Sequence, residues 1–167
     1  MKSQNKSNGL QTTQSELVLA TSVESLTSDI VTLKRASKLS IEKASKGVSI
    51  VVLKNQNKGT TISAIVLLLS ELKMYVKIDV DDEWLFDWAE TIAEDYYHFK
   101  FEDLILALKQ GAKQKQYGSI LLSDVLQWCF EYEKKRMQYH EQRNNNLKEG
   151  YDSNRGSEMT IKKYLDK

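Results

Sequence analysis

Proline is absent from this chain of 167 residues, and glycine occurs only seven times. Proline fixes the backbone angle φ and removes a hydrogen-bond donor, so it interrupts helices and is common in loops. A chain without proline and with few glycines favours long helices joined by short turns. We therefore predict an all-α protein, a compact helical bundle with a long C-terminal helix and disordered termini.

Cysteine is nearly absent as well. The single residue, Cys129, lies in the apolar run 128–130 and has no second cysteine with which to form a disulfide within the chain. We interpret Cys129 as a small buried hydrophobic residue. A reduced, cytoplasmic location is the default expectation for a chain of this kind.

The patterns that mark most catalytic and metal centres are also missing. The only histidines are His98 and His140, and neither has the spacing of a zinc site or of a Cys/His signature. The acidic residues between 79 and 87 lack the central glycine of a calcium loop, and they suit the N-terminus of a helix. No glycine-rich phosphate loop or nucleophile elbow is present. We expect no enzyme activity, no catalytic residue, no metal and no cofactor.

Long apolar runs are missing too, because no stretch of about 18 or more uninterrupted apolar residues occurs. We therefore expect no helix that spans a membrane and no membrane partner. The first 14 residues are polar and lack the apolar core of a signal peptide. We predict a disordered leader at 1–14, a helical domain at 15–148, and a flexible tail at 149–167 with a short amphipathic motif.

Apolar residues recur at helical spacing through the middle of the chain. A helix over 62–76, capped by Thr60 or Thr61, is apolar on every side at 64–69, so it should form the centre of the domain. A third helix should stop at Gly111. The helix between these two carries the following apolar face: Trp84, Leu85, Trp88, Ile92 and Tyr96. The last helix, from about Ser119, carries this stripe: Leu121, Val125, Trp128, Tyr132 and Tyr139.

Two N-terminal segments have weaker patterns. Residues 15–33 have helical spacing but contain many Ser and Thr residues, which compete for backbone hydrogen bonds. Residues 48–53 are β-branched and suit a strand, yet a lone strand has no obvious partner elsewhere in the chain. We favour a helix or a packed extended segment there, and the sequence leaves the choice open.

Charge is strongly segregated along the chain although the formal net charge is only +1. Residues 31–60 have a net charge of +6, residues 61–108 a net charge of −8, and residues 109–150 a net charge of +3. Such a chain could present a basic face to phosphates and an acidic face to a basic protein. The alternative is that the segments fold against each other and their charges partly cancel.

Two basic groups are candidates for nucleic-acid binding, because Lys and Arg contact phosphates and Tyr can stack on a base. The first group is Lys109, Lys113, Lys115 and Tyr117. The second, on the last helix, is Lys134, Lys135 and Arg136. The alternative for both is an ordinary solvated loop and helix.

Several motifs together resemble a known pattern. They are the aromatic-rich run 95–104, the residues 107–111, the pair Tyr117–Gly118, and the Trp- and Tyr-containing segment 128–136. Over about residues 60–145 the chain resembles an uncharacterised family of small helical proteins from phages and mobile elements of Bacteroidetes-type bacteria. The chain departs from that pattern at 119–124, where the family has a second aromatic and an acidic residue. The resemblance implies an accessory protein of DNA replication, such as a loader or organiser, and no known reaction.

Two hypotheses for function follow. The first is a non-enzymatic adaptor in phage or mobile-element DNA metabolism, which binds DNA, a replication protein, or both. The second is a protein–protein interaction module, such as a host-factor inhibitor or a homo-oligomeric structural protein, that binds no nucleic acid. The predicted partner-binding residues are Tyr132, Tyr139, Ile161, Tyr164 and Leu165.

Overall fold

The computed structural model describes residues 19–26, 32–77, 80–114 and 119–165, with side chains described up to residue 148 except that of residue 35. This part of the chain is all-α, as the sequence predicts. Two 3-10 helices come first, and longer helices follow. In chain order they are η1 (Val23–Ser25), η2 (Leu33–Lys38), α1 (Ile41–Ala44), α2 (Ile50–Gln56), α3 (Lys58–Val76), α4 (Asp82–Asp95), α5 (Phe101–Gln114) and α6 (Leu122–Leu165). The predicted leader at 1–14 lies outside the described residues.

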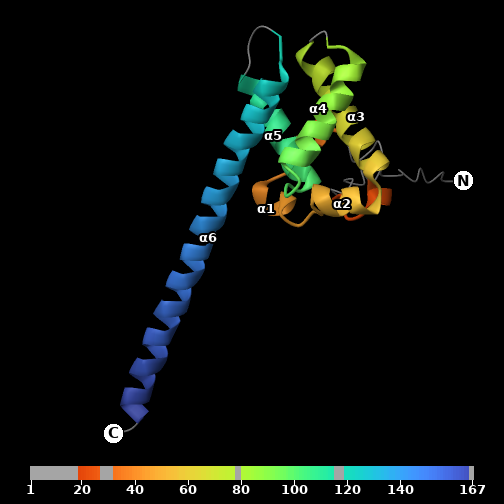
Figure 1. The fold of residues 1–167 in the computed structure, drawn as a ribbon. Helices are drawn as coiled ribbons and strands as arrows, with labels where there is room; N and C mark the ends of the chain where they lie inside the picture. The colour runs from red at the N-terminus through yellow and green to blue at the C-terminus, as the bar shows by residue number, and fades with distance from the viewer. Residues whose placement is uncertain (1–18, 27–31, 78–79, 115–118, 166–167) are drawn as a thin grey trace, which may run out of the picture.

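The helices form a small bundle with one long arm (Figure 1). Helix α3 packs against α4, and α5 packs against the first part of α6. The short helices α1 and α2 lie at one end of the bundle. From its N-terminal turns onward α6 runs past the bundle and extends away from it (Figure 1). The core is built by α2 to α5 and by the first turns of α6, and buried residues of η1, η2 and α1 add to it.

Helix α3 contacts several other elements, but it is not the buried centre that the sequence predicts, because α5 is buried over more of its length. Helix α3 also begins earlier than expected. Its N-cap is Asn57, whose side-chain oxygen accepts a hydrogen bond from the backbone N–H of Thr60 at 3.0 Å. Asn is among the best N-cap residues, so the predicted caps Thr60 and Thr61 lie inside the first turn instead. Ile65 and Leu68 are fully buried, whereas Leu67 is 53% exposed. One face of this apolar helix is therefore open to solvent.

By length and composition alone, α3 is apolar enough to cross a membrane, a test that the core helix of a soluble protein also passes. Counting uninterrupted apolar residues missed this property, because Glu71 and Lys73 interrupt the run. In this structure α3 contacts α2, α4, α5 and η2. The absence of a membrane partner stays a prediction.

Helix α4 buries most of the apolar face that the sequence predicts, including Leu85, Trp88 and Ile92. Trp84 was expected on the same face, but its side chain is 62% exposed. It lies about 100° around the helix from Leu85, at the edge of the buried side. Leu121 was likewise expected in the core and is 56% exposed, because it precedes the first residue of α6.

Helix α5 does not end at Gly111 as predicted but continues to Gln114. A Cβ atom built on Gly111 would lie 2.0 Å from Cδ2 of Trp128, inside van der Waals contact. Gly111 therefore allows α5 and α6 to approach each other closely. Its role depends on a tryptophan 17 residues further along the chain, which local helix-stop rules do not consider.

Residues 48–53 form a helix start rather than a strand. Ser49 makes an isolated antiparallel bridge with Lys100, and α2 begins at the next residue. The N–H groups of Ile50 and Val51 donate to the carbonyl oxygens of Phe99 and Tyr97 at 2.8 and 2.9 Å. The junction between α4 and α5 thus satisfies the polar groups that a sheet partner would otherwise have to satisfy.

The predicted helix over 15–33 is not continuous in the described residues. Residues 23–25 form the 3-10 turn η1, Leu33 begins η2, and residues 15–18 and 27–31 lie outside the description. At the other end of the chain, α6 continues to Leu165 instead of giving way to a tail near residue 148. No proline stops it, and each isolated glycine costs a helix only about 1 kcal/mol relative to alanine. At 1.5 Å per residue this helix is roughly 66 Å long.

Candidate functional site

A buried carboxylate fastens α6 to the bundle. Asp103, in the first turn of α5, is only 1% exposed. Its Oδ1 accepts a hydrogen bond from the hydroxyl of Tyr132 at 2.6 Å, and its Oδ2 accepts one from Nη1 of Arg136 at 2.7 Å. Oδ2 also accepts the backbone N–H of Lys100 at 2.9 Å. One side chain therefore joins the start of α5 to two successive turns of α6.

Two residues from the end of α4 reinforce this attachment. The hydroxyl of Tyr96 donates to the carbonyl oxygen of Leu126 at 3.0 Å, and burial raises the pKa of Tyr96 to about 12. His98 Nε2 lies 2.6 Å from Oε1 of Glu133. His98 therefore contacts α6 through its ring. The orientation of α6 is thus fixed by polar contacts along its first turns.

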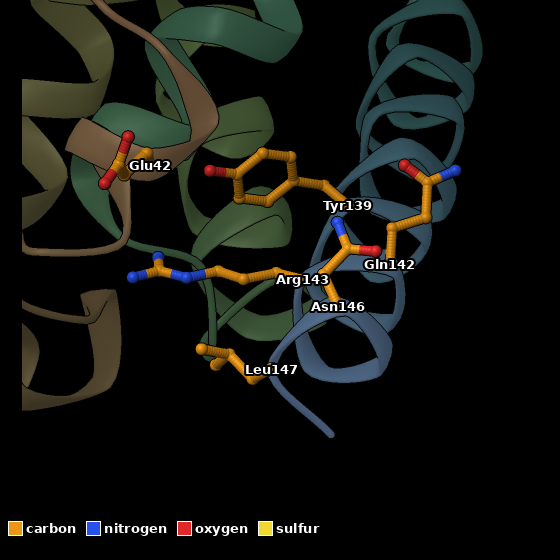
Figure 2. A pocket seen from close by; sticks show the side chains of 6 residues that line it. All are labelled: Glu42, Tyr139, Gln142, Arg143, Asn146 and Leu147. Atoms are coloured by element: carbon orange, nitrogen blue, oxygen red, sulfur yellow. The ribbon is translucent and has the colours of Figure 1, made fainter. Parts of the chain in front are cut away.

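A groove lies where α6 leaves the bundle. We call it the α1–α6 groove. Its lining residues are Glu42, Tyr139, Gln142, Arg143, Asn146 and Leu147. Its volume is about 390 Å³. Figure 2 shows that the side chains of Tyr139 and Arg143 extend from α6 toward α1, where Glu42 stands.

The α1–α6 groove combines apolar and charged groups. Tyr139 offers a ring and a hydroxyl, Arg143 offers a guanidinium, and Glu42 offers a carboxylate on the opposite wall. Leu147, at the outer end, is 63% exposed. An open groove with one residue of each charge and apolar side chains between them suits a polypeptide segment better than an enclosed small molecule.

The structure distributes the predicted partner-binding residues differently. The prediction that Tyr132 binds a partner at the surface is wrong, because its side chain is 1% exposed and its hydroxyl donates a hydrogen bond to Asp103. Burial, with the neighbouring carboxylate of Asp103, raises the pKa of Tyr132 above its usual value. Tyr139 lines the α1–α6 groove. The side chains of the remaining three lie outside the described part of the chain: Ile161, Tyr164 and Leu165.

The described members of the predicted nucleic-acid site lie on α5 and α6, which pack against each other, and Lys135 Nζ lies 3.5 Å from Oε1 of Gln110 on α5. Arg136 forms an ion pair with the buried Asp103, so its role is structural. Lys109 lies over the ring of Tyr75, 4.9 Å from its centroid, and Lys134 lies over the ring of Phe130 at 4.2 Å. The other two described lysines, Lys113 and Lys135, are exposed. Lys115 and Tyr117 lie outside the described residues.

Opposite charges meet across the fold. Lys58 pairs with Glu90 at 3.0 Å, and Lys54 lies 3.9 Å from Glu94, so the basic segment 31–60 contacts the acidic helix α4. A hydrogen bond to Glu90 raises the pKa of Lys58. Arg136 and Asp103 join the basic C-terminal part to the acidic middle in the same way. The charge segregation along the chain is thus partly cancelled in space.

A second buried carboxylate, Glu102, has no counterpart in the sequence predictions. Its side chain is 2% exposed, its Oε1 accepts the N–H of Ala20, and burial raises its pKa. Oε2 has no hydrogen-bond partner in the described structure. A Cβ atom on Gly47 would lie 2.0 Å from this oxygen. The hydrogen bond from Ala20 to Glu102 therefore holds the N-terminal segment against α5.

The burial of Glu102 and Asp103 was not predicted from the sequence, because adjacent acidic residues at the start of a helix usually face solvent. One signal was available for Asp103: Tyr132 and Arg136 are four residues apart, so they share a face of α6. For the rest, no group of three or more His, Cys, Asp or Glu residues within the described ranges has the geometry to hold a metal ion.

No family model matches the chain, and neither a curated protein nor a solved structure is significantly similar to it. The resemblance to proteins of phages and mobile elements therefore stays a hypothesis.

Proposed function

We propose that this chain is a non-enzymatic adaptor that binds a protein partner along α6, with the α1–α6 groove as the contact site. The supporting observation is the way α6 is held. Its first turns are locked to the bundle through Asp103, and the groove opens where the helix leaves the bundle. Helices without neighbours are only marginally stable in water, so a partner that covers the arm would stabilise it.

The groove residues suggest the chemistry of that partner. Tyr and Arg are the residue types that most often dominate binding energy at protein interfaces. Tyr139 and Leu147 would pack on an apolar side chain, and Arg143 would pair with a carboxylate of the partner. The proposed ligand is therefore a polypeptide segment with an apolar residue next to an acidic one.

The resemblance to phage and mobile-element proteins suggests where such an adaptor would act. An accessory protein of DNA replication, in the cytoplasm, must bring a second protein to its place of action. A long arm on a small domain fits that task. This context is part of the proposal and rests on the resemblance alone.

The experiment compares three full-length proteins in quantitative affinity capture from cells that carry the chain: wild type, Tyr139→Asp and Met137→Asp. Met137 is 56% exposed on the opposite side of α6, so it is the matched control. We expect a protein that wild type and Met137→Asp retain equally and Tyr139→Asp loses. Equal retention by all three proteins would contradict the groove as the contact site.

Nucleic-acid binding is the second proposal. The observation that favours it is the exposure of Lys113 on α5 and of Lys134 and Lys135 on α6. The ion pairs between the basic and acidic segments weigh against it. A salt-dependent gel shift with wild type and with Lys109/Lys113/Lys115→Ala tests it. No shift by wild type at low salt rejects this proposal and leaves the adaptor proposal intact.

A further inference from the structure

A pocket lies between the starts of α4 and α6. We call it the tryptophan pocket, and its volume is about 300 Å³. Figure 1 shows the first turns of both helices at the end of the bundle away from α1 and α2. The residues that line the pocket include Val80, Asp81, Trp84, Trp88, Ile120 and Leu121. Two segments that are far apart in the chain thus form one concave surface.

The apolar lining of the tryptophan pocket is partly open to solvent. Trp84 and Leu121, which the helical pattern places on core faces, are 62% and 56% exposed. Trp88 and Ile120, in contrast, are buried. The two exposed side chains therefore gather beside the core around one hollow instead of lying scattered over the surface. Large apolar side chains around a hollow are typical of a binding site.

Asp81 gives the pocket its charge. It is the N-cap residue of α4, yet its side chain accepts no hydrogen bond from the first turn of the helix. Aspartate is a favoured N-cap because its side-chain oxygen normally accepts such a bond, so this carboxylate is not engaged in capping. Asp81 is exposed, and it is the only charged residue among the described residues that line the pocket. Its carboxylate is therefore available to a hydrogen-bond donor that enters the pocket.

We infer that the tryptophan pocket binds an arginine side chain of a polypeptide partner. A guanidinium group is attracted to indole rings, and its N–H groups pair with a carboxylate such as Asp81 through two parallel hydrogen bonds. The aliphatic stem of the arginine packs on Val80 and Leu121. A quaternary ammonium group would bind the rings as well, but it has no N–H to donate to Asp81. This inference does not depend on the proposed contact at the α1–α6 groove.

The charges around the pocket favour a cation over a phosphate or a carboxylate. Asp82, Glu83 and Asp87 follow Asp81 in the first turns of α4, and all of them are exposed. Lys73 pairs with Asp82 at 3.2 Å and neutralises one of these charges. The N-terminus of α4 opposes a cation with roughly half a positive elementary charge, which the remaining carboxylates outweigh.

NMR spectroscopy of the indole N–H groups in the full-length protein tests the inference with N-acetyl-arginine amide as the probe. The chain has three tryptophans, and Trp128 is the internal control because it packs on Gly111 between α5 and α6. We expect saturable shifts of the Trp84 and Trp88 signals and none of the Trp128 signal. A single side chain is a small ligand, so the dissociation constant should be millimolar. N-acetyl-citrulline amide has the same stem and a neutral head, and it should bind about five-fold more weakly or not at all.

Two pairs of variants test the contacts. Asp81→Asn removes the charge and keeps a good N-cap, so it should weaken binding of the arginine probe by about five-fold. Asp87→Asn removes the same charge from an exposed position of α4 outside the pocket, and its effect should stay below about two-fold. Trp84→Ala should weaken binding by about ten-fold. Phe86→Ala, at a 49% exposed position of the same helix that does not line the pocket, should bind like wild type.

Three results would overturn the inference. The first is the absence of a saturable shift of the Trp84 and Trp88 signals up to the solubility limit of the arginine probe. The second is equal binding of the arginine and citrulline probes, which would mean that the pocket does not select a cation. The third is an equal loss of binding in Asp81→Asn and Asp87→Asn, which would indicate a general effect of charge rather than a contact in the pocket.

Discussion

Asp103 and Arg136 are 33 residues apart in the chain and form a buried ion pair, with Oδ2 and Nη1 separated by 2.7 Å. The carboxylate is 1% exposed, and the guanidinium side chain is 18% exposed. Cζ of Arg136 also lies 5.0 Å from the centroid of the Phe99 ring. This pair connects the N-terminus of α5, where the helix dipole already favours an acid, to the arm α6.

Arg136→Ala should destabilise the protein strongly. Removing one partner of a buried ion pair leaves the other charge uncompensated, which costs about 3 kcal/mol or more. Lys135→Ala is the matched control, because Lys135 is exposed and contacts Gln110 only at 3.5 Å. Its effect should stay within about 0.5 kcal/mol. Urea denaturation of both variants measures the difference, and equal free energies of unfolding would contradict a structural role for Arg136.

Gly111→Ala should also destabilise, although alanine is the better helix former. The added methyl group would overlap the ring of Trp128, so α5 and α6 must move apart, at a cost of about 2 kcal/mol. The control is Gly59→Ala in the first turn of α3, where the new atom would meet only Asn57 Oδ1 at 3.5 Å. There we expect no loss, or a gain of up to about 1 kcal/mol. Thermal unfolding followed by tryptophan fluorescence compares the two, and a stabilising Gly111→Ala would refute the close approach.

Glu102 should make stability fall with rising pH over part of the range. Burial raises the pKa of Glu102 above the ordinary value of 4.5 in the folded state. Asp103 raises the pKa further, whereas the N–H of Ala20 and the charge of Lys100 lower it. The contribution of Glu102 to stability is therefore complete below about pH 4.5 and is lost as pH rises through the folded pKa. The reason is that Glu102 loses its proton at a lower pH in the unfolded chain than in the folded chain.

Glu102→Gln isolates this effect because the amide does not titrate. We expect the difference in unfolding free energy, wild type minus variant, to decrease between pH 4.5 and pH 8. Chemical denaturation at closely spaced pH values provides the two curves. Parallel curves over that interval would show that Glu102 is not buried as described.

Cys129 should be unreactive in the folded protein. Burial raises the pKa of its thiol to about 12, and the side chain is fully buried, so a thiolate is scarce and inaccessible at neutral pH. Modification by a thiol reagent should proceed only at the rate of unfolding and should become fast in denaturant. Fast modification without denaturant would contradict the packing of α6 on the bundle.

Periodicity predicted α3 to α6 and most of their buried residues, because burial of an apolar face is a local property of the sequence. The helix predicted over 15–33 is not continuous in the described residues. It did not predict where such a face ends. Trp84 and Leu121 are apolar and in register, yet each lies at the edge of its element and is exposed. The role of Gly111 was inaccessible for a related reason, since it depends on Trp128 of another helix.

The candidate site was predictable only in part. Tyr139 was predicted to bind a partner, and in the structure it lines the α1–α6 groove. Tyr132 belongs to the same stripe but lies about two helical turns closer to the bundle, where its hydroxyl donates a hydrogen bond to Asp103. Arg136 looked like a phosphate ligand because a basic residue shows no sign in the sequence of the acid that it will meet.

The central claim is that α6 is a rigid arm held by Asp103 and Arg136. The most direct test is the distance distribution between spin labels at Lys46→Cys, on the exposed turn after α1, and Asn145→Cys on α6, in a full-length chain whose Cys129 stays unlabelled. We predict one narrow distribution in the otherwise wild-type chain and a broad one when Arg136→Ala is added. A broad distribution already present before Arg136 is changed would contradict the claim.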